Sequence, residues 1–161
     1  MRIATWNVNS IRARVDRVAA WVERSNVDIV AIQETKVADE KFPYQVFRDI
    51  GYEVAHHGFN QWNGVALISR VGISDVRIGF ENMPGFGGTP EDGPVDEARA
   101  IGGTCGGVQL WSLCIPNGRQ LGEPHLDYKL SWLEALRADG ERWLAADPQA
   151  RRWFTRWEPY A

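Results

Sequence analysis

DIVAIQE, residues 28–34, is an apolar run that ends in a carboxylate. Its centre, Ile29 to Ile32, shows no alternation of polar and apolar side chains, which predicts a strand buried on both faces. Glu34 stands at the carboxyl end of this strand. Functional sites of α/β proteins are built where strands end. The run therefore predicts both a central strand and the position of a site.

The residues before this strand predict a strand, a turn and a helix. Residues 2–8 (RIATWNV) form a short strand, and Ser10 is placed to cap the helix that follows. Apolar residues then recur at helical spacing, at Ile11, Val15, Val18, Ala19 and Val22. Two strands joined by a helix are the unit from which α/β sheets are built.

The residues after it predict more strands and a long helix. Strands are expected at 52–57 and 64–69, joined by the polar loop 58–63, and then at 73–79, 97–104 and 107–114. A Gly/Pro-rich loop occupies residues 82–95. Residues 126–146 predict a helix with an apolar stripe of Leu130, Leu133, Leu136 and Trp143. The order indicates an α/β fold with one mixed sheet and helices on one face.

Composition restricts the classes of function. At 161 residues, with 44% apolar and 24% charged residues, the chain fits one globular domain. Its net charge of −3 gives no global basic field, so any contact with DNA must rest on a local patch. Two cysteines, Cys105 and Cys114, are too few for a disulfide framework and fit a reducing cytoplasm. Without a signal core or a long apolar run, neither export nor membrane insertion is expected.

Glu34 and Asn7 are the first candidates for chemistry. A carboxylate at the end of a buried strand is costly unless it is paired or bound to a cation, so Glu34 requires a positive partner. Lys36 or a distant arginine would make an ordinary ion pair, which is commoner than a metal site. Asn7, at the end of the first strand, is a turn residue as often as a ligand.

Six segments, taken in their order along the chain, favour the metal-site interpretation of Glu34 and Asn7. The segments are ATWNVNSIRAR (4–14), IVAIQETK (29–36), NGVALISR (63–70), EARAI (97–101), IPNGR (115–119) and KLSWLEAL (129–136). Together they resemble the exodeoxyribonuclease III family of the endonuclease/exonuclease/phosphatase superfamily, from Met1 to about Pro148. The resemblance implies the N-terminal portion of a four-layer α/β/β/α sandwich. It also implies a Mg²⁺-dependent phosphodiesterase of base excision repair, which cuts double-stranded DNA at abasic sites and removes nucleotides from 3′ ends.

The resemblance assigns roles residue by residue. Glu34 would ligate Mg²⁺ (or Mn²⁺), and Asn7 would hold the metal or a phosphate oxygen. Arg99 would lie near the DNA phosphates, although it could equally pair with Glu97 or Glu34. Trp62 and Asn63 lie in a loop that faces DNA in this family; alternatively, Trp62 packs on its neighbours.

Two departures from the family pattern limit the expected activity. Cys114 stands where the family has a tyrosine near the phosphate; here it is expected to be a small buried side chain. The family's later Gly-Asp-x-Asn motif, a further Asp and the final Asp-His pair do not occur, and His56, His57 and His125 are not expected to replace them.

The tail, residues 149–161, has an atypical sequence after the family-like residues 1–148. Because tryptophan has the single codon TGG, one shifted frame across Trp153 and Phe154 encodes Leu, Met or Val followed by Val. That is the apolar start of the missing strand. The hypothesis is that a frameshift or a sequencing error near Gln149 produced this tail.

Two hypotheses for function follow. In the first, the chain is a truncated DNA-repair nuclease. Phosphoinositide phosphatases and sphingomyelinases of the same superfamily share the metal-binding corner, but the segment NQWNGVALISR (60–70) resembles the DNA-cutting branch more closely. In the second, the chain is an inactive remnant with residual metal or DNA binding. One sheet without its partner layer would then expose its inner face and associate with itself. That face would carry Val30, Ile32, Val65, Leu67 and Leu110.

Overall fold

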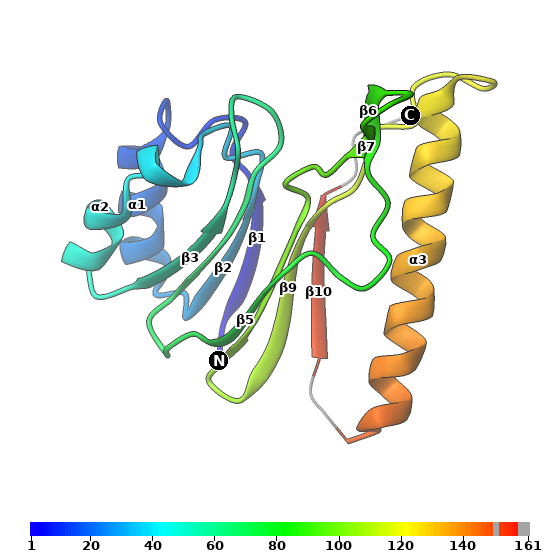
Figure 1. The fold of residues 1–161 in the computed structure, drawn as a ribbon. Helices are drawn as coiled ribbons and strands as arrows, with labels where there is room; N and C mark the ends of the chain where they lie inside the picture. Colours follow the sequence, from blue (N-terminus) through cyan, green and yellow to red (C-terminus); the bar gives the residue numbers. More distant parts are fainter. Residues whose placement is uncertain (150–151, 158–161) are drawn as a thin grey trace.

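The computed structural model describes residues 1–149 and 152–157 and contains two four-stranded sheets that lie face to face (Figure 1). Helices cover the outer face of each sheet, so the layers follow the order helix, sheet, sheet, helix. The predicted α/β class is confirmed. None of the helices in the described residues is both long and apolar enough to cross a membrane.

The first sheet has the strand order β1-β2-β4-β3. Its strands are β1 (Ile3–Asn7), β2 (Ile29–Gln33), β4 (Val65–Ser69) and β3 (Glu53–His57). β1 and β2 are parallel, whereas β4 is antiparallel to both of its neighbours. Helices α1 (Val15–Ser25) and α2 (Tyr44–Asp49) lie outside it, and a 3₁₀ turn, η1 (Asp39–Lys41), precedes α2.

The second sheet has the order β10-β9-β8-β5. Its strands are β10 (Arg152–Trp157), β9 (Val108–Cys114), β8 (Ala100–Cys105) and β5 (Ser74–Ile78). Helix α3 (Pro124–Ala146) covers its outer face, and β6 (Phe86–Thr89) pairs with β7 (Gly93–Val95) in a separate hairpin. The tail thus contributes a strand parallel to β9.

β2 explains why its sequence is apolar throughout. Val30 and Ile32 pack under the helices of the first sheet, while Ile29 and Ala31 face the second sheet. All of them are fully buried, as the sequence predicts for a strand covered on both faces. The buried Gln33 completes the layer by donating a hydrogen bond to Ser112 Oγ of the second sheet (3.0 Å).

The prediction of a single sheet is corrected, and with it the exposed inner face. Strands β5, β8 and β9 pair with one another rather than with the first sheet. Their inward side chains, such as Ile101 and Leu110, cover that sheet. The supposedly exposed residues Val30, Ile32, Val65, Leu67 and Leu110 are each 0% exposed. The predicted route to self-association through an uncovered sheet face is therefore wrong.

Local predictions near the helices also needed correction. Helix α1 begins at Val15 with Arg14 at its N-cap, so Ser10 is not the cap. In α3, Leu133, Leu136 and Trp143 of the predicted stripe pack against the core, but Leu130 is 55% exposed. Trp132, at 0% exposure, is buried instead, with its ring against Phe80. The loop 82–95 contains the β6–β7 hairpin.

Candidate active site

The corner at the ends of β1 and β2 brings Asn7 and Glu34 together. The two strands are parallel and Asn7 pairs in register with Gln33, so their carboxyl ends meet at one edge of the sheet. Asn7 Nδ2 donates a hydrogen bond to Glu34 Oε1 at 2.8 Å. The sequence prediction that these residues share a site edge agrees with this geometry.

The backbone after β2 is held in an unusual conformation. Glu34 has a φ of 54° and Lys36 a φ of 53°, in the left-handed region that side chains larger than glycine rarely adopt. Hydrogen bonds from Ser10 N to Glu34 O (2.8 Å) and from Lys36 N to Asn63 O (2.9 Å) hold this turn. Such strain persists only where neighbouring structure imposes it, and it concentrates at functional sites.

Lys36 is the ion-pair partner that the sequence predicted for Glu34. Its Nζ lies 3.2 Å from Glu34 Oε2 and donates to Asn9 Oδ1 at 2.5 Å. Asn9 N in turn donates to Asn7 Oδ1 at 2.9 Å. Both carboxylate oxygens of Glu34 therefore contact a donor, and one of these donors is a cation.

The donor set can be tested against a divalent metal ion. In residues 1–149 and 152–157, no three His, Cys, Asp or Glu side chains gather in one place. Mg²⁺ does not need such a cluster, because it keeps several waters and is often held by one or two carboxylates. Glu34 supplies one carboxylate, and the ammonium of Lys36 already places a positive charge against it. The corner fits Mg²⁺ as a site with a single carboxylate ligand.

A second cluster centres on Glu97, a residue that sequence reasoning treated only as a partner for Arg99. Its carboxylate accepts hydrogen bonds from Arg99 Nε (2.7 Å), Tyr128 OH (2.9 Å) and Asn63 Nδ2 (3.0 Å). Burial opposes ionisation of Glu97, but these donors outweigh it and lower the pKa of its carboxyl. Glu97 thereby joins the loop before β4, the segment before β8 and helix α3.

Arg99 is largely enclosed by this cluster. Its side chain is 12% exposed, and Nη1 donates to the carbonyl of Cys114 at 3.1 Å. Its pairing with Glu97, one of the alternatives from the sequence, is therefore present. Arg99 also lines the groove described next.

The two clusters share a groove of about 490 Å³. Glu34, Trp62, Asn63 and Arg99 all line it, so the structure gathers these predicted site residues around one space. Asn7 lies behind Glu34 and is not in the lining. Sequence reasoning missed Glu97, Phe86, Arg119, His125 and Tyr128, which also line it. Of these, Glu97 in EARAI and Arg119 in IPNGR stood within quoted segments.

Cys114 is a small buried side chain, as the sequence predicted, and His56 is also buried. Cys114 is 2% exposed in the core between the sheets, and burial raises the pKa of its thiol to about 11, so it is not an ionised nucleophile. His56 lies behind the Glu34 turn, with Nε2 2.8 Å from Thr35 Oγ1 and Nδ1 2.7 Å from Asp39 Oδ1. Burial lowers the pKa of His56 to about 4 despite Asp39, so the ring is neutral near pH 7.

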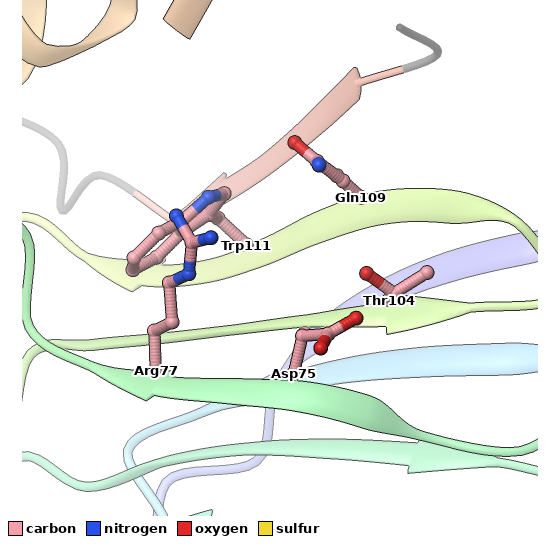
Figure 2. Close-up of a pocket in the computed structure, with 6 residues that line it drawn as sticks. Asp75, Arg77, Thr104, Gln109 and Trp111 are labelled. Atoms are coloured by element: carbon pink, nitrogen blue, oxygen red, sulfur yellow. The ribbon is translucent and has the colours of Figure 1, made fainter.

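A smaller cavity lies on the outer face of the second sheet (Figure 2). Its lining includes Asp75 and Arg77 of β5, Thr104 of β8, and Gln109 and Trp111 of β9. At about 50 Å³ it has room for little more than water. It contains none of the predicted site residues, so the chemistry of the groove at Glu34 makes that groove the candidate site.

Comparisons with known proteins agree with this choice. Residues 4–154 match the sequence profile of the Endonuclease/Exonuclease/phosphatase family. Exodeoxyribonuclease III of Haemophilus influenzae is 40% identical over 80 residues, which cover 50% of this chain and 30% of that protein.

Two solved structures are similar in fold. An AP endonuclease from Archaeoglobus fulgidus superposes with a TM-score of 0.83 and 33% identity, covering 97% of this chain and 56% of that one. The 3′ phosphatase NExo from Neisseria, bound to a product DNA hairpin, gives a TM-score of 0.80 and 31% identity, covering 90% of this chain and 53% of that one. The chain thus spans little more than half the length of these structures.

Proposed function

The chain belongs to the endonuclease/exonuclease/phosphatase family, and from this premise we propose that it is a divalent-metal-dependent phosphodiesterase acting on DNA. The proposed substrates are double-stranded DNA with abasic sites and DNA 3′ ends, within base excision repair. The observation that supports it is the hydrogen bond from Asn7 to Glu34, a carboxylate that lines the groove. Because the chain spans about half of its structural relatives, the activity of the whole relatives is carried over as a proposal.

Glu34 is the proposed metal ligand, with Mg²⁺ or Mn²⁺ as the ion. A bound divalent ion would supply positive charge to the scissile phosphate and to the charge that develops on the leaving oxygen. Asn7 orients the Glu34 carboxylate through its amide N–H. Lys36 neutralises the same carboxylate in the metal-free chain.

Trp62, Asn63 and Arg99 are the proposed DNA contacts. Trp62 is 65% exposed and can stack on a base or pack against a sugar. Asn63 and Arg99 both line the groove and are held in place by hydrogen bonds to Glu97. A cytoplasmic location, which the two free cysteines favour, also stays a proposal.

Cleavage of an abasic-site duplex in the presence of Mg²⁺ tests the enzyme proposal. Wild-type chain should cut the strand, and Glu34→Gln should reduce the rate by at least about a hundredfold if its charge holds the metal. Glu141→Gln is the matched control, because Glu141 is exposed on α3 and pairs with Arg137. Equal rates for wild type and Glu34→Gln would contradict the proposed role.

The second candidate is an inactive remnant that binds metal or DNA. It is favoured by one observation: both oxygens of Glu34 already have partners, Asn7 and Lys36. Absence of cleavage by the wild type, together with Mn²⁺ binding that Glu34→Gln abolishes, would establish this candidate. Robust cleavage that depends on Glu34 would exclude it.

A further inference from the structure

The segment that joins β5 to β8 is acidic. Between Arg77 and Arg99 the sequence has no lysine or arginine but five carboxylates, which are Glu81, Glu91, Asp92, Asp96 and Glu97. Two of them form ion pairs, Glu81 with Arg142 (3.3 Å) and Glu97 with Arg99 (2.7 Å). The ion pairs within residues 1–149 do not include the other three, which are exposed. This segment therefore adds uncompensated negative charge to one side of the molecule.

The β6–β7 hairpin of this segment contributes Phe86 to the wall of the candidate-site groove. The ring of Phe86 stacks on Tyr128, at a centroid distance of 4.7 Å and an interplanar angle of 23°, and contacts His125 at 4.6 Å. Both partners belong to α3, and the hairpin stands beside the N-terminal end of this helix (Figure 1). Because Tyr128 OH also donates to Glu97 (2.9 Å), the hairpin is docked on the cluster that holds Arg99.

The tip of the hairpin has a fixed shape. Thr89 pairs with Gly93, and a Cβ at Gly88 would lie 2.0 Å from Gly93 O, so the close approach of the two strands requires glycine there. Thr89 Oγ1 donates to Asp92 Oδ2 at 2.7 Å, and Asp92 N donates back to Thr89 Oγ1 at 3.1 Å. The carboxylates of Glu91 and Asp92 are therefore displayed on an ordered turn.

The cations of the groove lie on other segments of the chain. Lys36 follows β2, Arg99 precedes β8 and Arg119 follows β9, and all three line the groove. The hairpin adds only negative charge beside them. Like charges near a protein surface repel one another over roughly one Debye length, which is about 8 Å at physiological ionic strength. A DNA backbone is thus attracted by one part of the groove and repelled at the hairpin.

We propose that the β6–β7 hairpin makes the site select DNA that ends at the groove over duplex that continues past it. A continuous duplex must bring its phosphates close to Glu91, Asp92 and Asp96. A duplex that ends at the groove leaves the hairpin facing solvent and avoids this repulsion. The inference rests on the proposed function, and it specifies which form of DNA the groove accepts best.

Binding measured without hydrolysis tests the selection separately from catalysis. The full chain is titrated in EDTA, at low ionic strength, into two fluorescein-labelled DNAs of the same stem sequence, and anisotropy is followed. One is a dumbbell closed by a loop at each end, and the other is closed at one end and blunt at the other. The wild type should bind the blunt-ended DNA about fivefold more tightly than the dumbbell.

Neutralising the tip of the hairpin should remove this preference. In the double variant Glu91→Gln with Asp92→Asn, the ratio of the two affinities should fall below about twofold, through tighter binding of the dumbbell. Asp92→Asn keeps an oxygen to accept from Thr89, so the turn is retained. The matched control is Glu134→Gln with Glu141→Gln, which removes the same charge from exposed positions on α3 and should keep the wild-type ratio.

Salt provides a second readout. The Debye length falls from about 30 Å at 0.01 M to about 8 Å at 0.15 M ionic strength, so added salt should reduce the preference of the wild type for the blunt end. The double variant, which lacks the repulsion, should show a ratio that changes little with salt.

The inference is overturned by equal wild-type affinity for the two DNAs, by a preference that the double variant keeps, or by the absence of binding to either DNA. Equal affinity together with Glu34-dependent cleavage would leave the proposed activity standing without the selection. A preference that depends on the hairpin, without any cleavage, would contradict the activity and support the selection.

Discussion

The negative charge of the Glu34 carboxylate is balanced by the ammonium group of Lys36. Lys36 approaches one oxygen and Asn7 the other, so an incoming cation must displace an ammonium from the carboxylate. The ion pair is partly exposed, with side-chain exposures of 29% for Lys36 and 18% for Glu34, so its strength is moderate. Lys36 would therefore compete with the proposed metal ion for this carboxylate.

Replacing Lys36 with an uncharged side chain should strengthen metal binding. Lys36→Met removes the competing ammonium while keeping most of the apolar stem, and Mn²⁺ affinity should rise about fivefold. Titration followed by electron paramagnetic resonance of free Mn²⁺ measures this directly. Arg77→Met, far from the corner, should have no effect. Weaker binding by Lys36→Met would show that Lys36 supports the site rather than competing with the metal.

His56 should make the stability of the chain fall in mild acid. Its pKa is lowered by burial from the usual 6.5 to about 4, so between these values the unfolded chain binds a proton that the folded chain does not. The free energy of unfolding therefore decreases as pH falls from 6.5 to 4. Urea unfolding across this range should show a smaller decrease for His56→Gln than for the wild type. Parallel curves would contradict the assignment.

At the scale of elements, the turn after β2 depends on a glycine in the neighbouring loop. Gly64 has a φ of +89°, and a Cβ there would lie 2.0 Å from Thr35 Oγ1. Because Gly64 O also accepts from Thr35 N, the loop before β4 and the Glu34 turn cannot separate to make room.

Gly64→Ala should destabilise the chain by about 3 kcal/mol, since backbone strain and steric overlap add. Gly72→Ala is a matched control: its φ is +85°, but nothing lies within 4 Å of its Cβ position. It should cost about 1 kcal/mol, from the backbone alone. Denaturant titration measures the free energy of unfolding of both variants. An equal decrease in the two would show that the structure relaxes to relieve the overlap with Thr35.

The elements differ in how far their sequence predicts them. A continuous apolar run such as Ile29–Ile32 predicts its element well, because its side chains must be buried on both faces of the strand in any topology. In α3 the sequence predicts most of the buried stripe but not the choice between Leu130 and Trp132, because both are apolar and only the space beside Phe80 selects Trp132. The pairing of Glu97 with Arg99 was among the alternatives from the sequence, but the other two partners of Glu97, Asn63 and Tyr128, could not be predicted because they lie 34 residues upstream and 31 residues downstream.

At the scale of the whole molecule, the sequence predicts one mixed sheet, whereas the structure has two four-stranded sheets packed face to face. Strand patterns specify which residues face inward, but they do not state whether a later strand joins an existing sheet or starts another. Here Ile101 and Leu110 cover β2 and β4 face to face instead of extending them edge to edge. The site edge was nevertheless predictable, because parallel β1 and β2 must end together.

The frameshift hypothesis makes a prediction about the gene. β10 pairs in parallel with β9 and so occupies the next strand position in the second sheet. A frame shifted near Gln149 should encode an apolar strand at this position and continue into Gly-Asp-x-Asn. Sequencing the locus from an independent isolate is the measurement, and a shifted frame that soon meets a stop codon would contradict the hypothesis.

The burial of β2 makes its amide hydrogens a probe of the stability of the whole chain. Its backbone is hydrogen-bonded to β1 on one side and β4 on the other, and its residues are fully buried. Amide hydrogens in such a strand exchange with deuterium only when the whole chain opens, so their rates report the global free energy. Glu34 follows the last residue of β2, Gln33, in the chain. A metal ion bound at that carboxylate would therefore slow exchange along Ile29–Gln33, although it touches none of those amides.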